Sequence, residues 1–281
     1  MTDKCRYLKA VVFDWAGTTV DHGSRAPAIV FQEIFRREGL PITAAQAREP
    51  MGMAKREHIA AIAAASEVAA AWLAKFGRPC DDHDIDRMYE KFLPLQKQTL
   101  QEHCDVIAGA AESVAQCRGM GLKIGSSTGY TRELMKLVTV AAARQGYEPD
   151  CVLCAEDASR GRPAPYLLYE AARQLDVYPL STIVKVDDTP VGIEAGRNAG
   201  CWTIGVTRTG NCVGLSVDEL DSLPESEVRN LCDAAATRLS TAGAHFVVEA
   251  VSDLPDVIIE IERRMSTGDL PAVAVTDSSL V

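Results

Sequence analysis

Acidic, hydroxyl and basic residues follow separate apolar runs of this chain. The first run ends at Asp14, the second ends in Ser126-Ser127-Thr128-Gly129, Arg162 follows the third, and the fourth ends in Asp187-Asp188. Carboxylates from separate segments can share one hard cation such as Mg²⁺, while hydroxyls, backbone N–H groups and an arginine fork hold phosphoryl oxygens. A single aspartate after a strand is as readily a helix cap. Four such ends in this order predict a divalent cation facing a phosphoryl group.

A second group of residues carries amine chemistry. Met51, Lys55 and His58 lie at i, i+4 and i+7, which places them on one helix face if the helix already includes Met51. A lysine near apolar methionine side chains and a basic neighbour can have a lowered pKa, and an unprotonated amine condenses with an aldehyde or ketone. Taken alone, Lys55 reads as a surface lysine and His58 as a structural histidine.

The elements that position these residues alternate between strands and helices. Short apolar runs alternate with segments of helical spacing, which predicts a parallel sheet covered on both faces and therefore an α/β fold. The predicted strands are residues 9–14, 122–126, 151–154, 182–186 and 202–206, and the predicted helices are 110–118, 132–145, 165–175 and 192–199. Because ligands bind outside the carboxyl ends of parallel strands, the polar run ends should meet at one edge.

One long segment breaks this alternation. Residues 24–103 contain no convincing strand; helical patterns at 28–38, 54–75 and 84–102 predict a helical domain inserted after the first strand. We therefore predict a core of residues 1–22 and 104–281, a helical cap of residues 23–103, and hinges near 21–23 and 103–105. The segment 207–238 receives no assignment, and the tail 266–281 has weak periodicity.

Composition limits the function classes. The chain has 281 residues and a formal charge of −10, which argues against a nucleic-acid or anionic-membrane partner because both would be repelled. The N-terminus lacks a secretory signal, and the apolar stretch 60–74 is too short to span a bilayer. Nine irregularly spaced cysteines, including the Cys151/Cys154 pair, read as free thiols in a reducing compartment. A cytoplasmic location is expected.

The four polar run ends resemble the motifs of the haloacid-dehalogenase-like hydrolases, in order at Asp14, Thr128, Arg162 and Asp188. The resemblance implies a Rossmann-like core, a nucleophilic role for Asp14 and a cap over the active site. Phosphatases of this superfamily usually carry a second aspartate, a general acid, two positions after the nucleophile. That position here is Ala16, which cannot donate a proton.

Within that superfamily, the chain resembles the phosphonoacetaldehyde hydrolase (phosphonatase) family over nearly its whole length. The resemblance rests on the first motif, Asp14-Trp15-Ala16-Gly17-Thr18-Thr19, together with the Met-Gly-x-x-Lys-x-x-His segment that begins at Met51. Further matching segments are residues 23–27, 129–132, 161–166, 196–200 and 243–246.

The phosphonatase resemblance also implies roles for individual residues. Lys55 would form a Schiff base, and Met51 and His58 would assist catalysis or shape the pocket. Mg²⁺ would be bound by Asp14, the Ala16 carbonyl and Asp188, and the phosphoryl oxygens by Thr128, Gly129 and Arg162. Some members carry a further aspartate where this chain has Gly192; Asp187 could substitute for it. The resemblance also implies a homodimer formed through the caps.

The expected activity is hydrolysis of the P–C bond of phosphonoacetaldehyde to acetaldehyde and phosphate, through a lysine Schiff base and an aspartyl phosphate, in 2-aminoethylphosphonate degradation. One alternative is a small phosphate-ester phosphatase or phosphomutase of the same superfamily, which would need a general acid near Asp14. Another is a phosphate- or metal-binding regulatory protein without catalysis. The retained Asp14 and Lys55 disfavour the latter.

Overall fold

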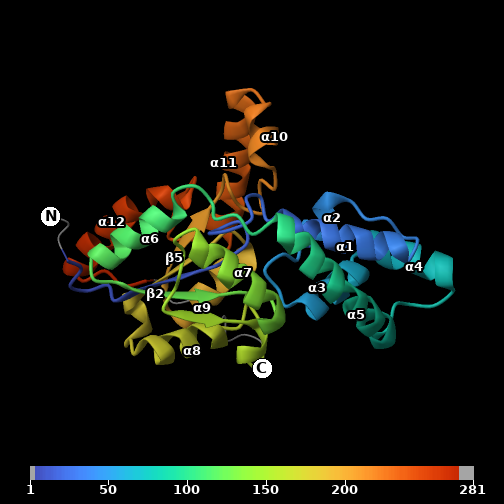
Figure 1. The fold of residues 1–281 in the computed structure, drawn as a ribbon, viewed down its shortest axis with the longest axis horizontal. Helices are drawn as coiled ribbons and strands as arrows, with labels where there is room; N and C mark the ends of the chain where they lie inside the picture. Colours follow the sequence, from blue (N-terminus) through green and yellow to red (C-terminus); the bar gives the residue numbers. More distant parts are fainter. Residues whose placement is uncertain (1–3, 272–281) are drawn as a thin grey trace, which may run out of the picture.

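A single parallel sheet forms the centre of the protein. The computed structural model describes residues 4–271, and its six strands have the order β3-β2-β1-β4-β5-β6 (Figure 1). The strands are β1 (Ala10–Phe13), β2 (Lys123–Ser127), β3 (Cys151–Leu153), β4 (Ile183–Asp187), β5 (Trp202–Val206) and β6 (Phe246–Val248). All five neighbouring pairs are parallel. The predicted α/β architecture is therefore confirmed.

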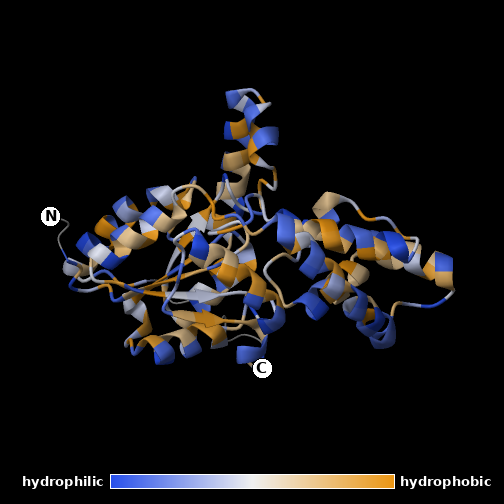
Figure 2. Ribbon diagram, in the orientation of Figure 1, coloured by the Kyte–Doolittle hydropathy of each residue, from blue (hydrophilic) through white to orange (hydrophobic). Residues whose placement is uncertain are grey.

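Helices cover both faces of this sheet. On β1, Val11 and Phe13 pack in the core cluster beneath α6 (Ala110–Gly119), α7 (Arg132–Arg144) and α12 (Leu254–Ser266). Ala10 and Val12 point the other way, into the cluster beneath α8 (Tyr166–Leu175) and α9 (Pro190–Ala199). This alternation follows from the two-residue period of a strand, and Figure 2 shows the strands mostly apolar and the helices two-sided.

The five predicted strands are confirmed, four with bounds shifted by one residue at one or both ends. The sixth strand, β6, was not predicted; it follows the segment 207–238, which received no assignment and interrupts the alternation of strands and helices. Cys151 and Cys154 are buried and free, as expected of small apolar side chains. The part of the tail beyond residue 271 lies outside the described residues.

A separate group of helices is inserted between β1 and β2 in the sequence. It contains α1 (Arg25–Arg37), α2 (Ala44–Arg48), α3 (Lys55–Ala64), α4 (Ser66–Phe76) and α5 (Asp82–Thr99), followed by a short 3₁₀ turn (Leu100–Glu102). These helices have a hydrophobic core of their own, which includes Phe31, Ile59, Trp72 and Phe92. The predicted strand-free insertion is thus confirmed, and Figure 1 shows it beside the sheet. The domain boundaries at 23 and 103 stay a prediction.

The single helix predicted over 54–75 is wrong, because the chain breaks at Ala65, whose backbone is extended. Ile59 and Val68 are nine residues apart, so a straight helix would place them on opposite faces. Both are buried in the same cap core, which the break makes possible. No single helix within residues 4–271 is long and apolar enough to cross a membrane; α3 and α4 pass that test only as a pair, bent by 79°.

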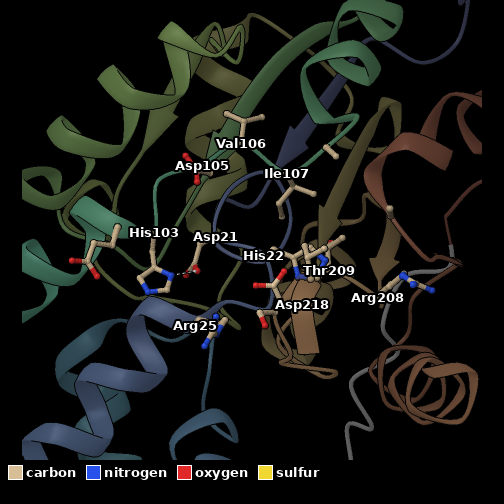
Figure 3. A pocket seen from close by; sticks show the side chains of 15 residues that line it. Asp21, His22, Arg25, His103, Asp105, Val106, Ile107, Arg208, Thr209 and Asp218 are labelled. Carbon is tan, nitrogen blue, oxygen red and sulfur yellow. Dashed lines mark ion pairs between the residues drawn. The ribbon is translucent and has the colours of Figure 1, made fainter. Parts of the chain in front are cut away.

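The two predicted hinges run side by side. Val20 and Val106 form an antiparallel bridge, the Asp21 N–H donates to the Asp105 carbonyl (3.1 Å), and the imidazole of His103 lies 3.4 Å from the Asp21 carboxylate. A cavity of about 620 Å³ lies against both crossings, and Figure 3 shows Asp21 and His103 facing each other there. Both connections between cap and core are therefore held together at one place.

The segment left unassigned in the sequence forms a helical hairpin. The short helix α10 (Val217–Asp221) is followed by α11 (Glu225–Thr241), and Figure 1 shows this hairpin standing out from the core. Leu220, Val228 and Cys232 give the hairpin a small apolar cluster. Its base reaches the cap, since Arg238 pairs with Glu49 at 2.8 Å.

Candidate active site

The polar residues that follow the apolar runs meet at one edge of the sheet, as predicted. Asp14 directly follows β1, Thr128 directly follows β2, and Asp187 and Asp188 stand at the end of β4, while β1 lies between β2 and β4 in the sheet. Arg162 reaches the same place from the loop before α8. The α/β topology therefore gathers residues that are far apart in the sequence.

Core and cap together line a small cavity of about 20 Å³ at this edge. From the core it is lined by Asp14, Ala16, Thr128, Gly129, Tyr130, Arg162 and Thr189, and from the cap by Ser24, Pro27, Met51, Gly52 and Lys55. Seven predicted site residues thus share one cavity. His58 and Asp188 do not line it.

The cap fits closely over the core at this place. A Cβ added to Gly129 would lie 2.5 Å from the Met53 carbonyl oxygen of the cap, so only a glycine allows this approach. One water needs about 10–15 Å³. The cavity as it stands therefore holds about one water, and a larger ligand enters it only if the cap shifts.

Three buried carboxylates form the acidic part of the site. One oxygen each from Asp14, Asp187 and Asp188 lie within 4.8 Å of one another. The Asp187 carboxylate is already occupied: it contacts Lys185 (2.8 Å) and Arg162 (3.2 Å), and it accepts two hydrogen bonds from Thr189.

Asp14 and Asp188 have more free coordination capacity than Asp187. The Asp188 oxygens accept one hydrogen bond each, from the Thr18 hydroxyl (3.0 Å) and the Asn211 N–H (2.7 Å). Burial and the Asp14 and Asp187 carboxylates raise the pKa of Asp188 well above its ordinary value. An oxygen-donor cluster in which one carboxylate, Asp188, has no ion pair within residues 4–271 fits a hard divalent cation.

Arg162 contacts the predicted nucleophile directly. Its Nη2 lies 2.7 Å from Asp14 Oδ1 and also donates to the Ser127 hydroxyl (3.0 Å). This contact holds the Asp14 carboxylate at the mouth of the cavity and keeps a positive charge beside it. The guanidinium itself is almost wholly buried.

Lys55 is buried and not a surface lysine, its side chain entering the cavity from the start of α3. The Lys55 Nζ lies 4.8 Å from the centroid of the Tyr130 ring and 5.6 Å from that of Phe31. Burial lowers the pKa of Lys55 to about 8 against the opposing attraction of Asp14, and nearby Arg162 adds to the lowering. A substantial neutral fraction at moderately alkaline pH suits an amine that attacks carbonyl groups.

The helix-face arrangement predicted for Met51, Lys55 and His58 is wrong for Met51. The helix begins at Lys55, and Met51 lies in the preceding turn, where its N–H donates to the Arg48 carbonyl (3.0 Å). Gly52, with a φ of 96°, does not continue a helix backwards. Met51 nevertheless lines the cavity.

His58 lies behind Lys55, in the cap core. Its ring stacks on Phe31, with centroids 3.7 Å apart, and its Nε2 donates to the Ala47 carbonyl (2.9 Å). Burial and Lys55 hold the pKa of His58 well below its ordinary value. Its place is that of a neutral residue supporting the helix that carries Lys55.

The sequence reasoning missed two residues of the site. Tyr130 lines the cavity and its hydroxyl has no hydrogen-bond partner within residues 4–271; it stands two positions after Thr128, where a closer reading of the second motif could have found it. Lys185 is fully buried in β4 and pairs with Asp187. Its signal was a lysine in the middle of an apolar run.

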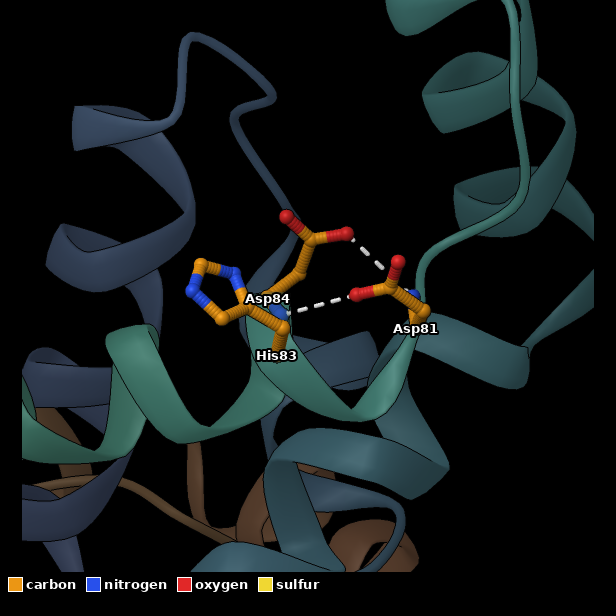
Figure 4. Close-up of side chains that lie close together, drawn as sticks. All are labelled: Asp81, His83 and Asp84. Carbon is orange, nitrogen blue, oxygen red and sulfur yellow. Dashed lines mark hydrogen bonds between the residues drawn. The ribbon is translucent and has the colours of Figure 1, made fainter.

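A second group of possible metal ligands, Asp81, His83 and Asp84, lies in the cap (Figure 4). Asp81 and Asp84 form the capping box at the start of α5. Both Asp84 oxygens also accept hydrogen bonds from Arg78, and one accepts from Arg87. These contacts explain the group as the beginning of a helix.

Comparison with known proteins decides the family. The haloacid dehalogenase-like hydrolase family matches residues 8–200. The phosphonoacetaldehyde hydrolase of Paraburkholderia xenovorans is 45% identical over 266 residues, covering 95% of this chain and all of that protein. The Nitratidesulfovibrio vulgaris protein of the same name is 44% identical over 264 residues, covering 94% of each chain.

The chain belongs to the phosphonoacetaldehyde hydrolase family of haloacid dehalogenase-like hydrolases. It is therefore a hydrolase. A solved structure of a phosphonoacetaldehyde hydrolase-like protein from Oleispira antarctica agrees with a TM-score of 0.93 at 39% identity, covering 96% of this chain and 98% of that one. A β-phosphoglucomutase from Bacteroides vulgatus, described as putative, shares the fold alone, with a TM-score of 0.61 at 18% identity, covering 91% of this chain and 89% of that one.

Proposed function

We propose that this protein hydrolyses the P–C bond of phosphonoacetaldehyde, releasing acetaldehyde and phosphate, as a step of 2-aminoethylphosphonate degradation. The observation that carries the proposal is the position of Lys55, a buried lysine of lowered pKa that shares a cavity with Asp14 and Ala16. A phosphatase needs a general acid at position 16 and has no use for an amine at position 55. Cleavage of a P–C bond needs the amine at position 55 and does not need a general acid at position 16.

Lys55 converts the carbon that is bonded to phosphorus into a leaving group. The neutral Nζ attacks the aldehyde carbon, water leaves, and a protonated imine forms one carbon away from the P–C bond. When that bond breaks, its electron pair moves into the C–N system and gives an enamine. The enamine takes up a proton at carbon, and water hydrolyses the resulting imine to acetaldehyde and free Lys55.

Asp14 accepts the phosphoryl group. Its free carboxylate oxygen attacks phosphorus while Arg162 holds the other oxygen, and water then hydrolyses the aspartyl phosphate. Thr128 and Gly129 would hold phosphoryl oxygens, which is supported by their position in the lining of the cavity that Asp14 also lines.

We assign the cation as Mg²⁺, held by Asp14, Asp188 and the Ala16 carbonyl. Its charge would neutralise the phosphoryl oxygens. Met51 closes the cavity from the cap side, and the buried His58 keeps Lys55 in position.

Exposed apolar residues on the cap support a proposal on how the protein assembles. Leu73 and Phe76 of α4 are 50% and 39% exposed on the cap, which supports a homodimer formed through the caps. Sedimentation of Leu73→Glu against the unchanged protein tests the dimer: a shift to monomer supports it, and an unchanged dimer refutes this interface.

All nine cysteines are free, which supports a reducing compartment, the cytoplasm.

Incubation with phosphonoacetaldehyde, with and without Mg²⁺, tests the activity. We expect equal amounts of phosphate and acetaldehyde, and little turnover once Mg²⁺ is chelated. A phosphate ester of glycolaldehyde serves as the matched substrate, because it offers an aldehyde but a P–O bond. Faster cleavage of the ester than of the phosphonate would refute the proposal and return the phosphatase alternative.

A further inference from the structure

Arg48, the last residue of α2, lies where the cap, the first crossing and the core meet. Its Nη1 donates to the carbonyl oxygens of Gly23 (2.7 Å) and Ser24 (3.2 Å), both in the first crossing. Its Nη2 donates to the Gly214 carbonyl of the core (2.8 Å). The guanidinium is half-buried and all these acceptors are neutral. Opening the cap would break the contact with Gly214 and leave its carbonyl without this donor.

Asn211 connects this arginine to the acidic cluster. Arg48 Nη1 also donates to Asn211 Oδ1 (3.1 Å), and Asn211 Nδ2 donates back to the Arg48 carbonyl (3.1 Å). The backbone N–H of the same Asn211 donates to Asp188 Oδ2 (2.7 Å). A cap residue and a carboxylate of the acidic cluster thus hold the same buried asparagine from two sides.

We propose that Arg48 is a latch that couples closure of the cap to the orientation of Asp188. With the cap closed, Arg48 fixes Asn211, and the Asn211 N–H fixes the Asp188 carboxylate that faces Asp14. With the cap open, Asn211 loses its side-chain partners and no longer fixes Asp188 Oδ2, and the Thr18 hydroxyl alone holds the other oxygen of Asp188. The site is then assembled only while Lys55 is shut inside it, and Arg48 is a positioning residue. The inference rests on the proposed function only in one respect, the assignment of Mg²⁺ as the cation held by Asp188.

Coupling of this kind must act in both directions. If closure orients Asp188 for a cation, then a cation on Asp188 must favour closure. Closure can be measured without a phosphonate, because Lys55 is 4% exposed in the closed cavity and should react with solution reagents only when the cap opens. Lys185, which is fully buried in the core, reports unfolding of the whole chain in the same sample.

The experiment is reductive methylation with formaldehyde and cyanoborohydride, followed by peptide mass spectrometry, with and without Mg²⁺. In the unchanged protein, Mg²⁺ should slow methylation of Lys55 by about fivefold or more. In Arg48→Met, methylation of Lys55 should be faster and Mg²⁺ should no longer slow it, while Lys185 stays unreactive. Arg56→Met is the control, because the ion-pair partners of Arg56 among the described residues, Asp82 and Asp86, both lie inside the cap, and it should keep the Mg²⁺ effect.

Equal Mg²⁺ protection of Lys55 in Arg48→Met and in the unchanged protein would overturn the latch. If Lys185 reacts in Arg48→Met, the variant has unfolded and Asn211→Ala replaces it. That substitution keeps the Arg48 contacts with Gly23 and Gly214 and the backbone N–H that donates to Asp188, but it removes both side-chain hydrogen bonds between residue 211 and Arg48. Full Mg²⁺ protection in Asn211→Ala overturns the proposal. Calorimetric binding of Mg²⁺ should weaken in parallel. Since no phosphonate is present, these results stand whether or not phosphonoacetaldehyde is the substrate.

Discussion

The Asp187 carboxylate occupies the space that a side chain at position 192 would need. A Cβ added to Gly192 would lie 2.0 Å from Asp187 Cγ, well inside van der Waals contact. In this position Asp187 pairs with Lys185 and Arg162, and Arg162 in turn contacts Asp14. The absence of an acid at position 192 and the presence of Asp187 are therefore one structural arrangement.

Gly192→Ala should damage this arrangement. The added methyl group would push Asp187 away from Lys185 and leave buried charges without partners, a change that costs about 3–5 kcal/mol when a buried pair is broken. We expect a lower thermal midpoint and a large loss of turnover. Gly161→Ala is the control, because its Cβ would meet only Ala54 at an ordinary 3.6 Å. Unfolding curves of Gly192→Ala and Gly161→Ala that coincide would contradict the packing described here.

The lowered pKa of Lys55 predicts how activity depends on pH. Below about pH 8 Lys55 is mostly protonated, and only the neutral amine attacks an aldehyde. At fixed Mg²⁺, kcat/KM should rise as pH increases towards about 8 and then level off. A rise that continues unchanged through pH 10 would mean that Lys55 behaves as an exposed lysine.

The sequence was sufficient to predict five of the six strands and the gathering of Asp14, Thr128, Arg162 and Asp188, because the carboxyl ends of parallel strands meet at one edge of the sheet. It also predicted the helical insertion, because those residues lack any strand pattern. It was not sufficient for the break at Ala65, which depends on packing Ile59 and Val68 into one core. Lys185 and Asp187 share a face of β4 because they are two residues apart, but the sequence does not give the side-chain rotamers that bring Lys185 Nζ within 2.8 Å of the Asp187 carboxylate.

Ala16→Asp restores the acid that phosphatases carry. Ala16 is 8% exposed in the small cavity, so the new carboxylate would stand close to the phosphonate and repel it. Cleavage of phosphonoacetaldehyde should become at least about tenfold slower. If it became faster, protonation of the leaving group would limit the reaction, against the proposed mechanism.

Substitutions of Asp14 and Asp188, the two carboxylates proposed to hold the cation, should have different effects. Asp14→Asn keeps the shape of the side chain but removes the nucleophile, so turnover should fall by about a thousandfold or more at any Mg²⁺ concentration. Asp188→Asn keeps the nucleophile, so a higher Mg²⁺ concentration should restore part of the activity. Mg²⁺ titrations of the two variants that look alike would contradict this division of roles.

Trapping the imine on Lys55 tests the central claim most directly. Borohydride added together with phosphonoacetaldehyde should convert the imine to a stable secondary amine, inactivate the enzyme and add mass to the peptide that contains Lys55. Borohydride alone should leave the activity unchanged. Lys55→Arg keeps the positive charge but stays protonated, so it should be inactive and unlabelled. Normal turnover by Lys55→Arg, or a label on another lysine, would contradict the mechanism.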